Sequence, residues 1–180
     1  RGAFKLEKAL EEFNFSVKDK IYLDVGASTG GFTEVLLKEG AVKVYAIDVG
    51  HDQLAQKLKD DPRVINLEGR NIRELTELPE LADGAVMDLS FISITKVLQQ
   101  VGNLLKKNAP LMALVKPQFE AGVERLPKDG VVKDENVRQQ ILDEVISFAT
   151  SNNWSHQKTI PSPIQGKNGN VEFLVYFLKN

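Results

Sequence analysis

The stretch KIYLDVGASTGGFT, residues 20–33, decides the fold of this chain. Residues 20–24 form a short apolar run of the kind found in buried strands, and a glycine-rich segment follows at once. An amphipathic segment then continues as far as Gly40, which is typical of a helix. A strand, a glycine-rich turn and a helix in direct succession indicate a βα unit of a parallel sheet. Ligands of such sheets bind at the carboxyl ends of the strands, so we expect a ligand beside the glycine-rich turn.

The same alternation of strand-like and helix-like segments continues along the chain. We predict further strands at residues 42–47, 64–67, 85–88 and 111–116, and helices at residues 5–13, 51–59, 94–107 and 135–150. Two final strands, residues 155–161 and 171–178, are joined by a segment too short for a crossover helix, so we expect an antiparallel pair at one edge. The pattern predicts a single domain over residues 1–180 with an α/β, Rossmann-like fold: a doubly wound, mostly parallel sheet with an antiparallel C-terminal strand.

A long polar segment separates the strand at residues 111–116 from the last helix. Residues 118–134 contain Gly122, Pro127 and Gly130 together with many charged side chains. We predict a mobile loop that covers the substrate, because this segment leaves the strand that carries Lys116. The charged side chains are equally consistent with an ordinary solvated surface.

Composition narrows the classes of protein that this chain can be. Hydrophobic residues make up 42% and charged residues 27%, as in soluble globular proteins. The longest apolar runs, such as residues 111–115, are far shorter than a membrane span, and the chain opens without the apolar segment of a signal peptide. With no cysteine and two histidines, we expect no metal site. These features predict a cytoplasmic protein without membrane contact.

The glycine-rich turn at residues 26–30 admits three interpretations. A dinucleotide site would need the pattern G-x-G-x-x-G, but Ser28 replaces the second glycine and Asp24 would repel a pyrophosphate. The hydrolase pattern G-x-S-x-G matches literally, yet a catalytic triad would also need a histidine. Neither His51 nor His156 lies in an obvious loop after a suitable strand. Both interpretations are therefore weaker than the third.

The third interpretation is the methyl-donor pattern D-x-G-x-x-x-G, in which glycines approach a methionine moiety and Asp24 lies near its ammonium group. Asp48 ends the next strand, where it can accept hydrogen bonds from ribose hydroxyls, and Asn71 lies where a polar side chain can hold adenine. The alternative is that Asp24 and Asp48 only cap the helices that follow them. We predict S-adenosylmethionine as the cofactor. Its predicted binding residues are Asp24, Gly26, Ala27, Ser28, Gly30, Gly31, Asp48, Val49, Asn71 and Asp88.

Four ionisable residues lie in four further motifs, three of them at strand ends and one in the first helix. Asp88 belongs to MDLSFIS, Lys116 to LVKPQFE, Glu172 to GNVEF and Lys5 to RGAFKL. An ionisable group at the end of an apolar strand must meet a partner or water, because burying a lone charge is costly. We expect Lys116 to face the same cleft as Asp88. Each residue could instead belong to an ordinary salt bridge, which for Lys5 alone is the better interpretation.

These motifs, together with DVGASTGGFT, resemble the hemolysin-A-like (TlyA-type) rRNA methyltransferases, relatives of the FtsJ/RrmJ ribose 2′-O-methyltransferases, over nearly the whole chain. The resemblance implies a catalytic tetrad of Lys5, Asp88, Lys116 and Glu172 that transfers a methyl group to a ribose 2′-hydroxyl of ribosomal RNA. It also implies that ribosomal RNA or ribosomal subunits, and not DNA, are the partners. Members of this family carry an N-terminal S4-type RNA-binding domain, which we expect to be missing here. Its loss would account for the net charge of −2, which is unusual for a protein that binds RNA.

Two other functions compete with this one. A membrane-active hemolysin should show a signal peptide or an amphipathic membrane-facing segment, and the sequence shows neither. A methyltransferase of another substrate class is the second alternative. Base amino groups are usually methylated by an Asn/Asp-Pro-Pro-aromatic motif, whereas residues 88–91 read Asp-Leu-Ser-Phe, which favours an oxygen acceptor. The sequence predicts neither the oligomeric state nor whether Lys116 acts as a general base or stabilises the developing alkoxide.

Overall fold

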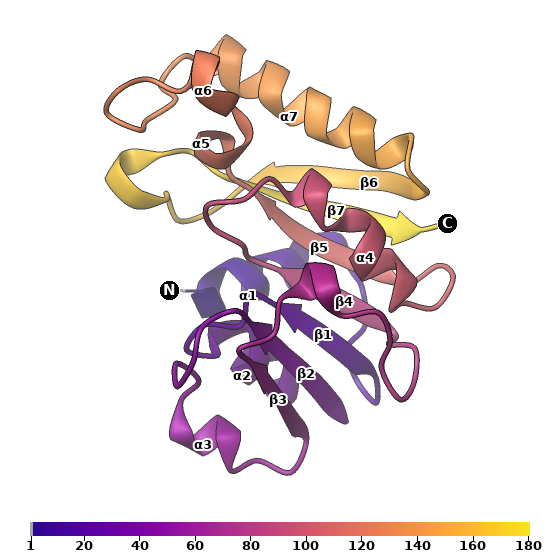
Figure 1. Ribbon diagram of the computed structural model, residues 1–180. Coiled ribbons are helices and arrows are strands. Elements are labelled where there is room, and N and C mark those ends of the chain that lie inside the picture. Colours follow the sequence, from indigo (N-terminus) through magenta and orange to yellow (C-terminus); the bar gives the residue numbers. More distant parts are fainter. Residues whose placement is uncertain (1) are drawn as a thin grey trace.

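The computed structural model describes residues 2–180, which form a seven-stranded sheet with helices on both faces (Figure 1). The strand order is β3-β2-β1-β4-β5-β7-β6. The strands are β1 (Ile21–Val25), β2 (Lys43–Asp48), β3 (Val64–Glu68), β4 (Gly84–Met87), β5 (Pro110–Val115), β6 (Trp154–Pro161) and β7 (Phe173–Lys179). Strands β1 to β5 run parallel, whereas β7 is antiparallel to both β5 and β6. The predicted fold class, with its antiparallel C-terminal pair, is confirmed.

Helices and short 3₁₀ turns connect the strands. They are α1 (Gly2–Phe13), α2 (Gly31–Lys38), α3 (Gln56–Lys59), η1 (Ile72–Glu74), η2 (Ile94–Lys96), α4 (Leu98–Asn103), α5 (Pro117–Glu120), α6 (Gly122–Arg125), α7 (Glu135–Thr150) and η3 (Lys167–Gly169). Helices α1 and α2 share one hydrophobic core with one face of the sheet. Helices α4 and α7 share a second core with the other face.

The apolar sequence of β5 follows from burial on both faces of the sheet. Leu111, Ala113 and Val115 belong to the core beneath α4 and α7. Met112 and Leu114 belong to the core beneath α1 and α2, and all five residues are fully buried. Parallel strands that are covered on both faces read as continuous apolar runs for this reason. The first ionisable residue after such a strand therefore stands at the edge of the sheet.

Helix α1 reaches the carboxyl edge of the sheet because it packs closely on α2. Leu6 and Phe13 belong to its buried stripe, at helical spacing. A Cβ at Gly31 would lie 3.4 Å from a backbone nitrogen of α1, so the glycine at the start of α2 permits this close approach. The helix predicted at residues 5–13 is confirmed and begins already at residue 2. Its first turns carry Lys5 to the edge where the parallel strands end.

The helix predicted at residues 51–59 is wrong over its first half. Only Gln56–Lys59 is helical. Glu68 Oε2 accepts hydrogen bonds from the backbone N–H groups of Gln53 (2.7 Å) and Leu54 (3.0 Å). These bonds to the end of β3 hold the segment outside helical geometry, so a tertiary contact overrides the local pattern.

The single helix predicted at residues 94–107 is divided into η2 and α4. The side chain of Ser93 caps η2 by accepting a hydrogen bond from the Thr95 N–H at 3.2 Å. After α4 ends, the Lys106 N–H donates to the Ala82 carbonyl at 3.0 Å. Pairing with Ala82, two residues before β4, therefore ends the helical segment early.

The segment 118–134, predicted as one polar loop, contains the last three residues of α5 and all of α6. Helix α6 follows α5 directly, and Figure 1 shows both beside the start of α7. Ala121 and Val132 are buried against Ile141 of α7, so each end of the segment has an apolar anchor. The residues between these anchors are mostly exposed. The predicted loop thus contains short helices, and its mobility and its role in covering the substrate stay predictions.

Candidate active site

A cavity of about 310 Å³ opens at the carboxyl edge of the sheet. Its volume is that of a small-molecule site, at the lower end of the usual range of about 300–1,000 Å³. The walls come from the segments that follow β1, β2, β3 and β4. The predicted cofactor residues that line it are Gly26, Ser28, Asp48, Val49 and Asp88. The ligand site predicted beside the glycine-rich turn therefore coincides with a cavity.

Gly26 is required by the way in which β1 meets β4. Its φ of +85° lies in the left-handed region, and a Cβ there would lie 2.3 Å from the Asp88 carbonyl oxygen. The N–H groups of Gly26 and Ala27 both donate to the Ile47 carbonyl, at 2.9 Å and 3.0 Å. The turn thus joins the ends of β1, β2 and β4 into one surface. A larger residue at position 26 would displace Asp88 from the cavity wall.

Asp48 is held at the cavity wall by two backbone donors. Its Oδ2 accepts a hydrogen bond from the Ser28 N–H at 2.7 Å, and its Oδ1 accepts one from the Gly50 N–H at 2.8 Å. Each carboxylate oxygen can accept a further hydrogen bond. Asp48 is therefore an oriented acceptor suited to a ligand diol, as predicted for a ribose.

Asp24 lies behind the glycine-rich turn and does not line the cavity. It is fully buried, with Oδ2 accepting a hydrogen bond from Thr33 Oγ1 at 2.7 Å and with no partner for Oδ1. Burial raises the pKa of Asp24 to about 7, the Thr33 hydrogen bond opposes the shift, and the charge of Asp88 adds to it. The geometry gives Asp24 a contact with α2, and its contact with a donor ammonium stays a prediction.

Four other predicted cofactor residues stand outside the cavity wall. Ala27 is buried, and Gly30, at φ +104°, faces α3, where a Cβ would lie 2.2 Å from a leucine side chain. Gly31 faces α1. Asn71 is exposed and caps η1, because its Oδ1 accepts a hydrogen bond of 3.0 Å from a backbone N–H of that turn. These residues shape the fold around the cavity and do not form its surface.

Several wall residues were missed by the sequence analysis: Gln53, Arg70, Ile72, Leu89, Ser90 and Phe91. Arg70 and Ile72 flank Asn71 and line the cavity, and the contact of Asn71 with adenine stays a prediction. Phe91 is 89% exposed and has a φ of +66°, which is rare for a bulky residue. Its ring centroid lies 5.0 Å from that of Phe119. Its place in the MDLSFIS motif after a strand was the available signal.

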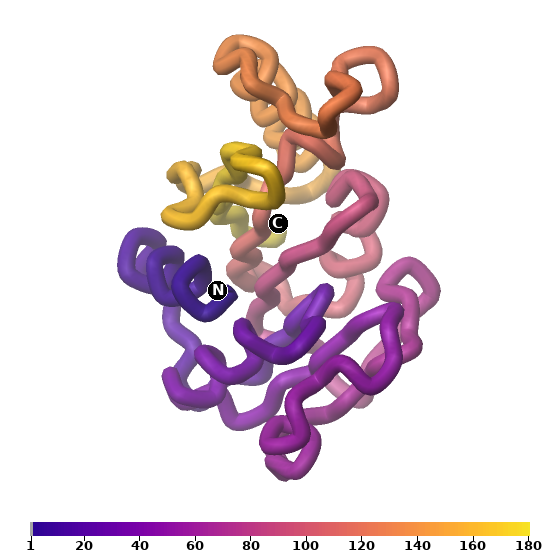
Figure 2. The backbone as a smooth tube through the Cα atoms, turned by 90° about the vertical axis from the view of Figure 1, so that its left-hand side faces the viewer, coloured from indigo at the N-terminus to yellow at the C-terminus, as the bar shows by residue number. Residues whose placement is uncertain are grey.

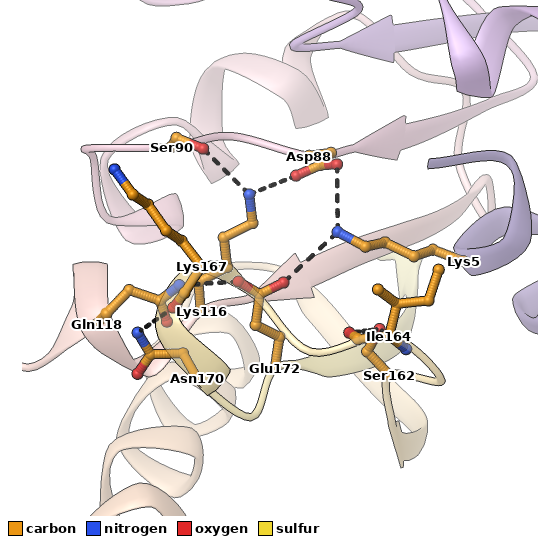
Figure 3. A network of polar contacts seen from close by, with 10 residues as sticks. All are labelled: Lys5, Asp88, Ser90, Lys116, Gln118, Ser162, Ile164, Lys167, Asn170 and Glu172. Carbon is orange, nitrogen blue, oxygen red and sulfur yellow. Dashed lines mark hydrogen bonds and ion pairs between the residues drawn. The ribbon is translucent and has the colours of Figure 1, made fainter. Parts of the chain in front are cut away.

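The four residues of the predicted tetrad converge at the same edge of the sheet (Figure 3). Lys116 Nζ lies 2.6 Å from Asp88 Oδ1. Lys5 Nζ lies between the two acids, 4.0 Å from Asp88 Oδ2 and 3.6 Å from Glu172 Oε1. Figure 2 shows the reason: α1, at the start of the chain, lies beside the connection between β6 and β7, near the end of the chain.

The tetrad is largely shielded from water. The side chains of Lys5, Lys116 and Glu172 are 10%, 9% and 3% exposed, and that of Asp88 is 23% exposed. Two cations face two carboxylates, so no charge is buried without a counter-charge. Lys116 Nζ also lies 3.2 Å from Ser90 Oγ. An ammonium has three donors, so after Asp88 and Ser90 one donor of Lys116 is left for a ligand.

Asp88 connects the cavity to the tetrad. It lines the cavity and contacts both lysines. A ligand in the cavity and a second reactant held by the lysines would therefore meet beside one carboxylate. Within residues 2–180, no group of three or more histidine or acidic side chains is placed to hold a metal ion.

Comparison with known proteins defines the family. The FtsJ-like methyltransferase family matches residues 1–179. The chain belongs to this family. A solved structure called "Putative hemolysin from Streptococcus thermophilus" superposes on 100% of the chain and 66% of that protein, with a TM-score of 0.97 and 44% identity. A structure called "putative S-adenosylmethionine dependent methyltransferase from Listeria monocytogenes" shares the fold, with a TM-score of 0.74 at 16% identity.

Relatives of known sequence are named either as rRNA methyltransferases or as hemolysins. "Putative rRNA methyltransferase YqxC" of Bacillus subtilis is 47% identical over 98% of the chain, which spans 64% of that protein. "16S/23S rRNA (cytidine-2'-O)-methyltransferase TlyA" of Mycobacterium tuberculosis is 45% identical over 98% of the chain, which spans 66% of it. "Hemolysin A" of Brachyspira hyodysenteriae is 44% identical over 99% of the chain and 75% of its own length. The chain thus spans about two thirds to three quarters of these relatives.

The cavity fits the methyl donor that this FtsJ-like methyltransferase fold uses. Asp48 and Asp88 place carboxylates in its wall, which suits a cationic ligand with a ribose and would repel a pyrophosphate. Ile47, Ile72 and Leu89 supply apolar surface for an aromatic base. The wall contains no histidine, so the hydrolase interpretation has no general base at Ser28. The predicted class of cofactor, S-adenosylmethionine, is confirmed by the family.

Proposed function

We propose that this chain is the catalytic domain of an S-adenosylmethionine-dependent rRNA methyltransferase that acts on a ribose 2′-hydroxyl. The observation that carries this proposal is the double position of Asp88, in the donor cavity and in the lysine network. The names of the Mycobacterium tuberculosis and Bacillus subtilis relatives support ribosomal RNA as the substrate. The Asp-Leu-Ser-Phe sequence at residues 88–91 supports an oxygen acceptor over an exocyclic amine.

Donor binding is the task of the cavity wall. When bound, S-adenosylmethionine supplies an electrophilic methyl group on a sulfonium centre. Asp48 accepts hydrogen bonds from the ribose hydroxyls of the donor, and its two backbone contacts keep it oriented for this. Asp88 places a second negative charge in the cavity wall, which would favour a cationic sulfonium. The glycine-rich turn keeps these two carboxylates in one surface.

Acceptor activation is the task of the lysines. Lys116 is paired with Asp88 at 2.6 Å, a charge-assisted contact that orients its amino group. Its remaining N–H group donates a hydrogen bond to the 2′-oxygen of the RNA ribose and stabilises the negative charge that develops there. The hydroxyl proton released on methylation would pass to Asp88, the most exposed member of the tetrad, and then to water. Lys5 and Glu172 keep Asp88 and Lys116 in position.

RNA binding is a task that this domain shares with other parts of the protein. The chain carries a net charge of −2, whereas proteins that bind RNA alone usually carry an excess of Lys and Arg. The relatives are longer than the chain, which leaves room for a basic RNA-binding segment of the S4 type. No helix within residues 2–180 has the length and apolar character needed to cross a bilayer.

Methylation of ribosomal subunits by the full-length protein tests the proposal. Labelled donor should transfer its methyl group to rRNA, and the modified linkage should resist alkaline hydrolysis, because a methylated 2′-oxygen cannot attack the phosphate. Asp88→Asn should lose both donor affinity and transfer. Asp83→Asn is the matched control: Asp83 lies just before β4, pairs with Lys106 at 2.7 Å and has a side chain of similar exposure, 19%. A label on a base, or full activity of Asp88→Asn, would refute the assignment.

A further inference from the structure

The turn between β5 and α5 contacts both acids of the site. Lys116, the residue after β5, binds Asp88 at 2.6 Å. Two residues later, Gln118 Nε2 donates a hydrogen bond to Glu172 Oε2 at 2.8 Å (Figure 3). Pro117 stands between them as the first residue of α5, where its ring restricts the backbone. One rigid turn therefore sets the positions of both carboxylates.

Glu172 depends on Gln118 for hydrogen bonding. Its side chain is 3% exposed, and within residues 2–180 Gln118 supplies the one hydrogen bond that the carboxylate accepts. The other oxygen, Oε1, lies 3.6 Å from Lys5 Nζ, a distance of charge attraction without a hydrogen bond. A buried carboxylate with one donor takes its orientation from that donor. The Gln118 amide therefore decides which way Glu172 points.

The orientation of the Gln118 amide is itself determined. Gln118 is 8% exposed, so its side chain has little freedom to find other partners. Its nitrogen must face Glu172, because an amide oxygen in that place would repel the carboxylate. The amide oxygen is buried and has no hydrogen-bond partner. This unsatisfied oxygen lowers stability, and the hydrogen bond from the amide nitrogen to Glu172 offsets the loss.

Gly166, in the connection between β6 and β7, confines the same carboxylate. A Cβ at this position would lie 2.1 Å from Glu172 Oε2 and 3.2 Å from Gln118 Nε2. The connection therefore packs directly on the hydrogen bond between Gln118 and Glu172. The φ of Gly166 is −75°, which alanine also adopts, so a methyl group there would act by displacing the carboxylate and not by straining the backbone.

We propose that Gln118 is a positioning residue for methyl transfer: it holds Glu172 so that the free carboxylate oxygen faces Lys5. This inference rests on the proposed function, since Gln118 acts through Glu172 on the lysine network. Gln118 does not line the donor cavity. Its loss should therefore lower turnover on RNA and leave donor affinity unchanged.

A double-mutant cycle in the full-length protein, with ribosomal subunits as substrate, tests the inference. Gln118→Leu should lower kcat about threefold to tenfold with the donor Kd unchanged. The same substitution should have no further effect in a Glu172→Ala background, because the residue through which it acts is gone. Gln100→Leu is the matched control: Gln100 also donates one part-buried hydrogen bond, to the Leu75 carbonyl at 2.8 Å, away from the site.

Three results would overturn the inference: wild-type kcat for Gln118→Leu, a full effect of Gln118→Leu in the Glu172→Ala background, or a parallel loss of Tm and donor affinity beyond that of Gln100→Leu. If Glu172→Ala itself kept full activity, the proposed role of Glu172 would fail first. The two failures are therefore distinguishable.

The pH profile of Gln118→Glu adds a measurement that a merely structural role would not move. The charged groups near Glu172 are Lys5 of α1, Asp88 after β4 and Lys116 after β5, while Lys167 of the β6–β7 connection points away from it in Figure 3. The carboxyl group introduced at position 118 would lie beside Glu172, and two adjacent carboxyl groups resist joint ionisation. At lower pH the pair shares a proton, so an O–H group again donates a hydrogen bond to Glu172. The activity of Gln118→Glu relative to wild type should rise as pH falls, and that of Gln118→Leu should not. A flat ratio for Gln118→Glu would contradict the proposal.

Gly166→Ala reaches the same carboxylate without removing a polar group. It should lower kcat to about the level of Gln118→Leu, and its effect should also vanish in the Glu172→Ala background. Wild-type turnover of Gly166→Ala would show that the position of the carboxylate does not matter to the reaction.

Discussion

The proposed methyl-donor half and the proposed acceptor half of the site are built in different ways. The methyl-donor cavity is formed by segments that follow four successive parallel strands. Its key hydrogen-bond acceptor, Asp48, is oriented by backbone N–H groups. The acceptor network joins side chains from α1, from the ends of β4 and β5 and from the start of β7. Its members are oriented by one another. The donor half is thus a local backbone structure, and the acceptor half is a product of tertiary packing.

This difference predicts how each half responds to substitution. Substitution of a side chain in the cavity, where backbone N–H groups orient Asp48, should remove only the affinity for the methyl donor that this side chain contributes. A mutually oriented network should lose turnover when any member is removed, because each removal leaves a buried charge without its partner. Substitutions in the two halves should therefore separate donor binding from catalysis.

Lys116→Ala should produce the largest effect. The ammonium of Lys116 stabilises the reacting oxygen by hydrogen bonding, and its removal should lower kcat by roughly 10²–10³-fold, the usual cost of losing one such group. The donor Kd should stay close to that of wild type. Labelled transfer to ribosomal subunits and calorimetry with the donor measure the two quantities. Lys43→Ala, which breaks the pair with Glu80 at the opposite end of the parallel strands, is the control and should keep full activity.

Asp48→Ala should have the converse effect. The loss of hydrogen bonds to a charged acceptor, worth roughly 1.5–3 kcal/mol, should weaken donor binding by about tenfold to a hundredfold. At saturating donor, kcat should remain near the wild-type value. A large fall of kcat at saturation would show that the two halves are not separable.

Glu172→Ala should be milder than Lys116→Ala. Glu172 acts on Lys5 and does not contact the acceptor, so kcat should fall about tenfold, which corresponds to about 1.4 kcal/mol. Donor binding again serves as the internal control. A loss as large as that of Lys116→Ala would assign Glu172 a direct part in the reaction and would remove the distinction between the reacting and the supporting members of the tetrad.

Asp24→Asn should have the smallest effect on turnover, and it should act on stability and its pH dependence. Burial raises the pKa of Asp24 to about 7, whereas in an unfolded chain an aspartate has a pKa of about 3.9. Its protonated form therefore contributes stability that is full below pH of about 4 and is lost as pH rises through about 7. The Tm of Asp24→Asn relative to wild type should rise over this range, by about 3 °C or more. A pH-independent difference in Tm would contradict the raised pKa.

Asp83→Asn provides the control of opposite sign. Burial raises the pKa of Asp83, but hydrogen bonds from Lys106 and from the Ile21 N–H outweigh it, so the pKa is lowered overall. Its stabilising contribution is present above the unfolded value and is lost as pH falls. Asp83→Asn should therefore be less stable than wild type at neutral pH and approach it in acid.

Local sequence by itself determined the sheet, the position of the donor cavity and two of its important residues. Apolar runs predict buried parallel strands, and Gly26 and Asp48 stand where such strands must end. Side-chain direction was less predictable. Asn71 caps η1 while its two neighbours line the cavity, because the direction in which a side chain points from a turn depends on the hydrogen bonds of that turn.

Tertiary structure alone decided how the ends of the chain meet. The motifs carrying Lys5 and Glu172 were recognised by their resemblance to a family, since no local period relates residues 5 and 172. They converge because α1 packs on α2 while β7 inserts between β5 and β6. Gln118 had no signal of its own, although it follows Lys116 by two residues. Its function depends on a single hydrogen bond to a distant strand, and a side chain's partner across the fold is set by packing, which no stretch of sequence contains.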